Sequence, residues 1–177
     1  AQVMAGLLLD AGIALAPRPE AAVVLIVNTC AFIEAAREEA AAAILQACAH
    51  KAAGGCRGVV VTGCLPQRYG VRLLPGFPGV DAFVGIDELD RVPAIVRAVA
   101  AGERGMVAVS GTPSRLFDPP RPALSFSGGP FSWLKIAEGC GHACAFCAIP
   151  AIRGRFRSRP VEALVAEADA LLRAGSR

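Results

Sequence analysis

Apolar runs alternate with helical patterns along the first two thirds of the chain. Short aliphatic runs rich in β-branched residues are typical of strands buried on both faces of a sheet. Such strands are predicted at 23–27, 59–62, 81–84 and 106–109. Between them, apolar residues recur at helical spacing and predict helices at 3–11, 33–53, 67–74 and 90–101. We expect Asp90 to cap the last of these helices. The alternation indicates an α/β fold with a doubly wound parallel sheet, which we assign to residues 1–112.

The last third of the chain has a different organisation. Residues 111–130 contain five Pro, three Gly and three Ser, which predicts a linker over 113–130. A strand over 133–137, a cysteine-rich loop, an arginine-rich stretch and a helix over 160–174 follow. Because one strand and one helix cannot close a core, we expect 131–177 to be the beginning of a truncated second domain. We likewise expect a strand before Val3 that this sequence lacks.

Composition narrows the class of protein. The chain has 177 residues, 54% of them apolar, and a net charge of +3, which excludes a mainly disordered chain. No uncharged apolar stretch reaches the roughly 18 residues of a membrane span, so no membrane partner is expected. The charge is too small to indicate nucleic-acid binding. Without a secretory signal we expect a cytoplasmic protein, whose seven cysteines serve metal binding or catalysis rather than disulfides.

Three cysteines lie within eight residues, at Cys140, Cys144 and Cys147. Thiolates are soft ligands that suit iron–sulfur clusters and zinc. Three ligands on a cubane cluster would leave one iron open to a substrate, much as a catalytic zinc site keeps an open position. A zinc site with His142 as the fourth ligand, or a set of merely buried cysteines, are the alternatives. Both fit less well, because structural zinc usually takes paired Cys-x-x-Cys units and because three cysteines so close together are hard to explain as packing.

Two more cysteines, Cys30 and Cys64, each follow a predicted buried strand directly. The carboxyl ends of parallel strands share one edge of a sheet, where ligand sites of α/β proteins form. Cys30 also precedes a helix, whose N-terminus favours a thiolate. Two buried core cysteines are the alternative, because free cysteine is commonly buried. We expect Cys48 and Cys56 to be structural thiols.

Two families carry these motifs. We call the eight residues 140–147 the cysteine octet. With Phe146 before Cys147, it resembles the signature of the radical S-adenosylmethionine (SAM) superfamily. The resemblance implies that Cys140, Cys144 and Cys147 hold a [4Fe-4S] cluster whose open iron is chelated by the amino and carboxylate groups of SAM. Reduction of the cluster would then cleave SAM to a 5′-deoxyadenosyl radical, with Phe146 near the adenine. Residues 131–177 would be the first βα unit of a partial (β/α) barrel.

The segments Asn28-Thr29-Cys30 and Thr62-Gly63-Cys64 resemble the amino-terminal domain of the methylthiotransferases, a family of radical SAM enzymes. This resemblance implies a second [4Fe-4S] cluster that delivers or carries sulfur. Cys30 and Cys64 would be two of its three ligands, and the third would lie upstream of Ala1. The cofactors implied are therefore two [4Fe-4S] clusters and SAM, with an electron donor as a partner.

The arginine-rich stretch bears on the substrate. Arginines at 153, 155, 157 and 159 would share one face of an extended segment, either as a solvated loop or as contacts to an anion. The segments 134–140 and 152–160 are similar to family members that act on a small-subunit ribosomal protein. The resemblance implies addition of a methylthio group to the β-carbon of an aspartate there. Members that act on transfer RNA typically have Glu at Phe156 and Thr at Ile152. They remain the alternative, with phosphate-binding arginines.

Overall fold

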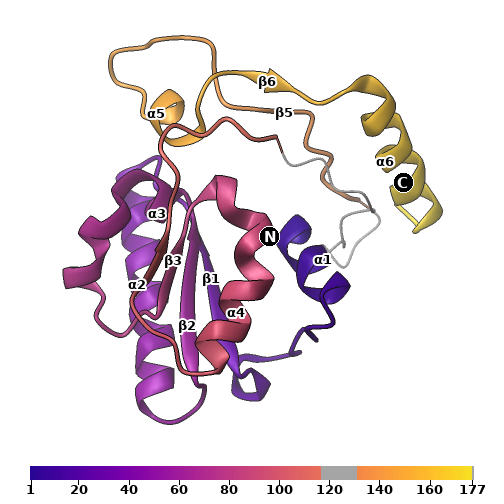
Figure 1. Ribbon diagram of the computed structural model, residues 1–177. Coiled ribbons are helices and arrows are strands. Elements are labelled where there is room, and N and C mark those ends of the chain that lie inside the picture. Colours follow the sequence, from indigo (N-terminus) through magenta and orange to yellow (C-terminus); the bar gives the residue numbers. More distant parts are fainter. Residues whose placement is uncertain (117–130, 177) are drawn as a thin grey trace.

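A parallel sheet lies at the centre of the structure, a computed structural model that describes residues 1–116 and 131–176 (Figure 1). Its strand order is β1-β2-β3-β4. The strands are β1 (Val24–Thr29), β2 (Gly58–Gly63), β3 (Ala82–Val84) and β4 (Met106–Ala108). Every residue of β2 is buried, as its uninterrupted apolar run predicts. The predicted parallel α/β sheet is confirmed, and most of the predicted linker falls outside the described residues.

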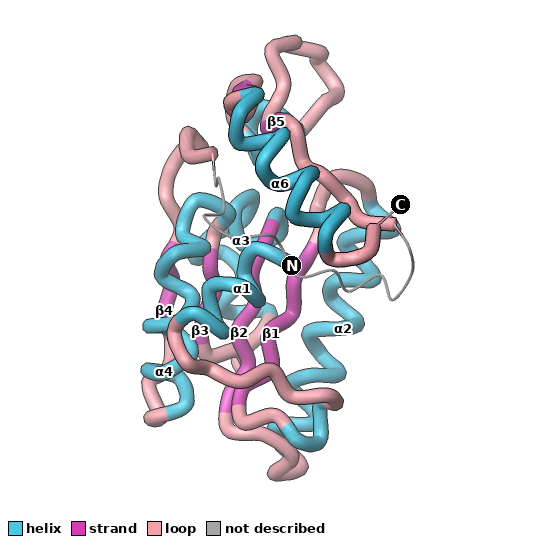
Figure 2. The backbone as a smooth tube through the Cα atoms, turned by 90° about the vertical axis from the view of Figure 1, so that its right-hand side faces the viewer, coloured by secondary structure: helices cyan, strands magenta, loops and turns pink. Residues whose placement is uncertain are grey.

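Helices cover both faces of this sheet (Figure 2). One face carries α2 (Glu34–Ala52) and α3 (Cys64–Tyr69), and the other carries α1 (Gln2–Asp10) and α4 (Val92–Ala100). Successive strand residues point to opposite faces. Val59 and Val61 therefore join the core on the α2 side, and Val60 joins the core on the α4 side.

The connections differ in detail from the predicted elements. The helix expected at 67–74 begins at Cys64, and after Tyr69 it continues as a 3₁₀ helix, η2 (Gly70–Gly76). The predicted cap of α4 is wrong, because Asp90 belongs to a preceding 3₁₀ helix, η3 (Ile86–Arg91). The carboxylate of Asp90 pairs instead with Arg115, at 3.0 Å. A further 3₁₀ turn, η1 (Pro19–Ala21), precedes β1.

A smaller unit lies over the carboxyl end of the sheet (Figure 1). It contains β5 (Ala137–Glu138), α5 (Ile149–Arg153), β6 (Arg157–Ser158) and α6 (Val161–Arg173). The helix predicted at 160–174 is confirmed, but the strand predicted at 133–137 is wrong in extent. Only Ala137 and Glu138 pair, antiparallel with β6, because residues 131–136 meet no partner strand in the described chain. The assignment of this unit to a barrel stays a prediction.

The described residues form no helix that is both long and apolar enough to cross a membrane.

Candidate functional site

The carboxyl edge of the sheet brings Cys30 and Cys64 together. Thr29 and Gly63 are partners in the register of β1 and β2, and each cysteine follows its strand directly. The thiol of Cys30 is exposed, whereas Cys64 is 1% exposed. Burial raises the pKa of Cys64, and the nearby Cys30 adds to this rise. The expectation that they meet at one sheet edge is therefore confirmed.

Gly63 fixes the path of the chain into Cys64. Its φ of 103° lies in the region that favours glycine, and a Cβ there would lie 2.5 Å from the carbonyl oxygen of Thr29. The hydroxyl of Thr29 donates to the carbonyl of Thr62 at 2.7 Å and accepts from the amide of Leu65 at 3.3 Å. These hydrogen bonds tie the two strand ends together. Because a side chain at residue 63 would clash with Thr29 there, the position of Cys64 depends on a glycine at residue 63.

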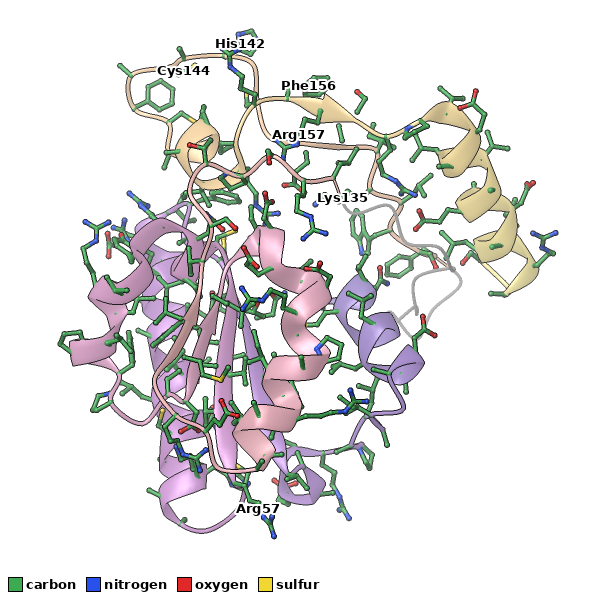
Figure 3. The ribbon with its side chains drawn as sticks, in the orientation of Figure 1. Arg57, Lys135, His142, Cys144, Phe156 and Arg157 are labelled. Carbon is green, nitrogen blue, oxygen red and sulfur yellow. The ribbon has the colours of Figure 1, made fainter. Side chains whose placement is uncertain are left out.

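The octet forms a loop between β5 and α5, and this loop projects from the molecule in Figure 3. The amide of Cys147 donates to the carbonyl of Cys144 at 3.1 Å, which makes a turn inside the loop. Cys144 is exposed, while Cys140 and Cys147 are half-buried, and all three are free thiols. The side chain of Phe146 is 93% exposed, so no described residue covers it.

The predicted cluster ligands can be tested for fit. Across residues 1–116 and 131–176, no three His, Cys, Asp or Glu side chains are arranged to hold a metal ion. The chemistry of the donors nevertheless fits an iron–sulfur cluster, because three free thiols share one short loop and two share a sheet edge. Cluster binding at Cys30, Cys64 and the three octet cysteines stays a prediction.

Arg153 connects the two groups of cysteines. Its Nη2 donates to the sulfur of Cys64 at 3.0 Å, and its Nη1 donates to Oε1 of Glu138 at 2.8 Å. Its guanidinium also lies 5.7 Å from the ring centroid of Phe32. Glu138 in turn forms an ion pair with Lys135. A residue at the end of the cysteine loop thus reaches the thiol that follows β2.

Burial and neighbouring charges shift two of these groups. Burial raises the pKa of the Cys64 thiol, and the positive charge of Arg153 acts against this rise. Burial also lowers the pKa of Lys135 to about 8, and repulsion from Arg153 adds to the effect. The site therefore combines a desolvated thiol with a lysine that loses its charge around pH 8.

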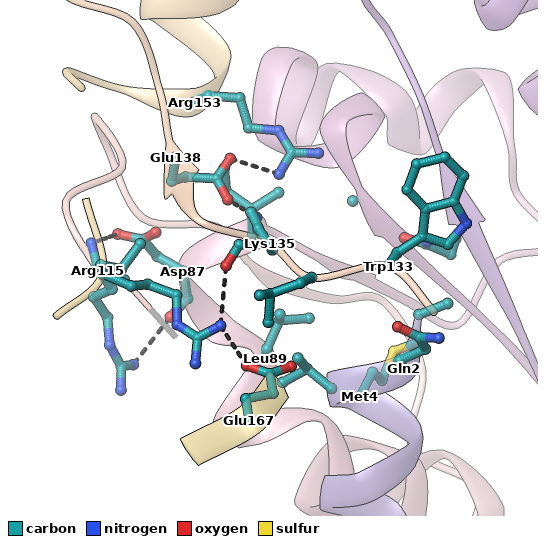
Figure 4. Close-up of a pocket in the computed structure, with 18 residues that line it drawn as sticks. Gln2, Met4, Asp87, Leu89, Arg115, Trp133, Lys135, Glu138, Arg153 and Glu167 are labelled. Carbon is teal, nitrogen blue, oxygen red and sulfur yellow. Dashed lines mark hydrogen bonds and ion pairs between the residues drawn. The ribbon is translucent and has the colours of Figure 1, made fainter. Parts of the chain in front are cut away.

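A cavity of about 420 Å³ adjoins these residues (Figure 4). Its walls come from the sheet edge at Asn28 and Gly63, from Lys135 and Glu138 near β5, and from Glu167 of α6. The charged groups in its walls are paired, as in the ion pairs Arg153–Glu138 and Arg159–Glu167. The cavity therefore lies between the two units, and Gly63, the residue before Cys64, belongs to its wall.

The arginine-rich stretch is not extended along one face, contrary to the sequence expectation. Arg153 ends α5, and Arg157 in β6 donates to the carbonyls of Arg153, at 3.1 Å, and Pro113, at 3.3 Å. Arg159 is buried and donates to the carbonyl of Lys135 at 2.9 Å. Of these four arginines, only Arg155 has an exposed position. Arg153, Arg157 and Arg159 therefore make contacts within the smaller unit and to the first unit instead of forming a single solvated face.

Sequence reasoning missed the roles of Arg153, Glu138 and Gln67. The side chain of Gln67 accepts from the amide of Ile86 at 3.0 Å and donates to the carbonyls of Ser110 and Gly111, at 3.0 and 2.9 Å. It thereby joins α3 to the ends of β3 and β4. The sequence signal for this role is weak, because Gln67 is a single polar side chain at the start of the helix predicted at 67–74.

Comparison with known proteins shows similarity along the whole chain. Residues 1–85 match Uncharacterized protein family UPF0004. The chain is 44% identical over 177 residues to ribosomal protein uS12 methylthiotransferase RimO of Trichlorobacter lovleyi, which covers 100% of this chain and 39% of that protein. Its identity to the protein of that name from Heliobacterium modesticaldum is 44% over 174 residues, covering 98% of this chain and 37% of the relative. For Syntrophus aciditrophicus it is 45% over 180 residues, covering 99% and 39%. The chain therefore spans about two fifths of the length of these curated relatives.

Proposed function

We propose that this chain belongs to the methylthiotransferase family and is part of an enzyme that adds a methylthio group to an aspartate β-carbon of ribosomal protein uS12. The observation that carries the proposal is the 44% identity to a uS12 methylthiotransferase over 177 residues, because it spans both the sheet domain and the cysteine octet. The relative's name supplies the protein substrate. The aspartate and the reaction come from the motif resemblance.

In this proposal Cys140, Cys144 and Cys147 hold one [4Fe-4S] cluster with an open iron for SAM. Cys30 and Cys64 supply two ligands of a second cluster, and Phe146 packs on the adenine of SAM. The bound clusters and SAM would supply the radical that removes hydrogen from the aspartate carbon and the sulfur that replaces it. What supports the assignment is the set of free thiols on one short loop and at one sheet edge.

The chain's own residues prepare the place of reaction. Radical chemistry needs an enclosed site from which water and competing donors are excluded. The cavity of about 420 Å³ beside Gly63 has walls from both units and could enclose the substrate side chain there. Lys135 and Glu138 give it a polar wall suited to an aspartate and its backbone. A cytoplasmic electron donor completes the proposal, because SAM cleavage consumes an electron.

Deletion of the gene and complementation would test the proposed function. We expect mass spectrometry to find the methylthio group on uS12 in the wild type, to lose it in the deletion strain, and to find it restored by the full-length gene. Variants in which Cys140, Cys144 or Cys147 is replaced by Ser should not restore it, whereas Cys56→Ser should. An unmodified uS12 in the wild type, accompanied by methylthio transfer RNA that depends on this gene, would overturn the proposal.

A further inference from the structure

Arg153, we propose, is a positioning residue that joins the two cysteine sites: it holds the octet loop against the sheet edge and hydrogen-bonds the Cys64 sulfur that would bind the second cluster. The part of this inference that concerns a cluster rests on the proposed function. The part that concerns the contact between the two units does not, because it follows from distances within the protein.

The guanidinium of Arg153 has partners in both units. Nη2 of Arg153 lies 3.0 Å from the sulfur of Cys64, and Nη1 lies 2.8 Å from Oε1 of Glu138. The group also lies over the ring of Phe32. These partners come from the start of α3, from β5 and from the loop before α2. One side chain therefore contacts the first unit at two places and the second unit at one.

The backbone on both sides of Arg153 is anchored. The preceding residue, Ile152, is 0% exposed and packs in the same apolar cluster as Cys64 and Phe83. The following residue, Gly154, has a φ of 75°, and a Cβ there would lie 2.0 Å from the carbonyl oxygen of Pro113. Its own carbonyl accepts from the amide of Cys140 at 3.2 Å. Arg153 is thus held between the first unit and the first cysteine of the octet.

The guanidinium of Arg153 has a further N–H group that can donate a hydrogen bond. Nε of Arg153 is buried and has no hydrogen-bond partner among the described residues. A buried donor without an acceptor costs free energy, so a sulfur atom bound at Cys64 would be a favourable partner for it. Because a guanidinium is always charged, Arg153 can donate to thiolate and cluster sulfur at any working pH.

Arg153 should also change the reduction potential of a cluster bound at Cys64. Hydrogen bonds to the sulfurs of an iron–sulfur cluster, and nearby positive charge, are among the features that set its reduction potential. Both favour the more negative, reduced state. Loss of Arg153 should therefore lower the potential of the cluster at Cys64 and leave the octet less firmly held. Arg155 offers a matched control, because it lies two residues away at an exposed position.

The experiment uses the full-length protein with Arg153→Gln, Arg153→Lys and the control Arg155→Gln. In the cluster-free protein, hydrogen exchange of the amides at 140–154 should rise several-fold in Arg153→Gln, fall partly back in Arg153→Lys and stay unchanged in Arg155→Gln. In a background where the three octet cysteines are alanine, a redox titration followed by electron paramagnetic resonance should give a lower potential for Arg153→Gln than for Arg155→Gln. Arg153→Lys should lie between them.

The outcomes separate this inference from the proposed function. Unchanged hydrogen exchange in Arg153→Gln would overturn the joining role, and an unchanged potential, or no iron bound in the background without octet cysteines, would overturn the cluster role. If Arg153→Gln does not fold, Arg153→Lys is compared with Arg155→Gln instead. Arg153→Lys should then show faster hydrogen exchange at 140–154 and a lower potential, and equality in either measurement would overturn the corresponding role. Faster exchange combined with an unmodified uS12 in the wild-type strain would refute the proposed function and leave the joining role intact.

Discussion

Lys51 and Asp81 form a buried ion pair at the amino end of the sheet. The ammonium of Lys51 lies 2.6 and 2.7 Å from the two carboxylate oxygens of Asp81, a residue that is 2% exposed. The same carboxylate forms an ion pair with Arg104, whose Nε lies 2.9 Å away, and accepts from the amide of Val59 at 2.8 Å. One side chain thereby joins α2, the start of β2 and the loop before β4, opposite the edge that carries the cysteines.

Asp81→Ala should destabilise the protein strongly, because it removes the acceptor of the Val59 amide and the counter-ion of the Lys51 ammonium, which keeps its hydrogen bond to the carbonyl of Gly79. Removal of one partner from a buried ion pair typically costs about 3–5 kcal/mol, and the partial exposure of Lys51 favours the lower end. Urea denaturation measures the change. Glu39→Gln, at an exposed position of α2, is the control and should stay within about 0.5 kcal/mol of the wild type. An equal effect of both substitutions would contradict the role given to Asp81.

Gly63→Ala should disturb the cysteine edge. The positive φ and the Cβ contact with the carbonyl of Thr29 require the chain to shift, at a cost of about 1–3 kcal/mol for the strained conformation alone. We expect less iron bound at Cys30 and Cys64 as well as a lower midpoint of denaturation. Gly6→Ala is the matched control, because Gly6 lies in α1 with open space around a Cβ. That substitution should stabilise the protein by about 0.5–1 kcal/mol; a loss of iron there would argue against the explanation.

Lys135 should react as an amine at a lower pH than ordinary lysines. Its pKa is lowered from 10.5 to about 8, so about half of the folded molecules carry the neutral amine at pH 8. Competitive acylation at that pH, read by mass spectrometry, should label Lys135 faster than Lys51, which Asp81 holds. The depressed pKa also means that Lys135 takes up a proton on unfolding between about pH 8 and 10.5. Its contribution to stability therefore rises with pH in that window. Lys135→Gln should remove this rise; equal labelling of the two lysines would contradict the shift.

All three octet cysteines should be needed for the same cluster, the one with an open iron for SAM. Anaerobic reconstitution of Cys144→Ser in the full-length protein should lose about half of the bound iron, because a cubane needs all three thiolates to stay bound. Cys56→Ser is the control and should keep the full iron content, since that thiol donates to the carbonyl of Gly58 and is not one of the predicted cluster ligands. Tightly bound zinc in the wild-type protein, in place of iron, would refute the cluster assignment.

The sequence carries enough information for the sheet and for one of its edges. A continuous apolar run identifies β2, and the parallel register of β1 with β2 brings Cys30 beside Cys64, so pattern alone locates that pair. The contact of Arg153 with Cys64 is not predictable in this way. It joins residues 89 positions apart and exists only once α5 packs on α3. The strand predicted at 133–137 exists but has the wrong extent, because the extent of β5 depends on its partner β6 and not on its own residues alone.

The unequal exposure of Cys30 and Cys64 has a consequence for handling the protein in air. Oxidants reach a thiol in proportion to its accessibility and its thiolate fraction. Cys30 is open to solvent, whereas Cys64 is enclosed and has a raised pKa. In protein without clusters, damage by peroxide should begin as a sulfenic acid on Cys30 while Cys64 stays reduced. Prompt addition of a thiol reductant should then recover the pair.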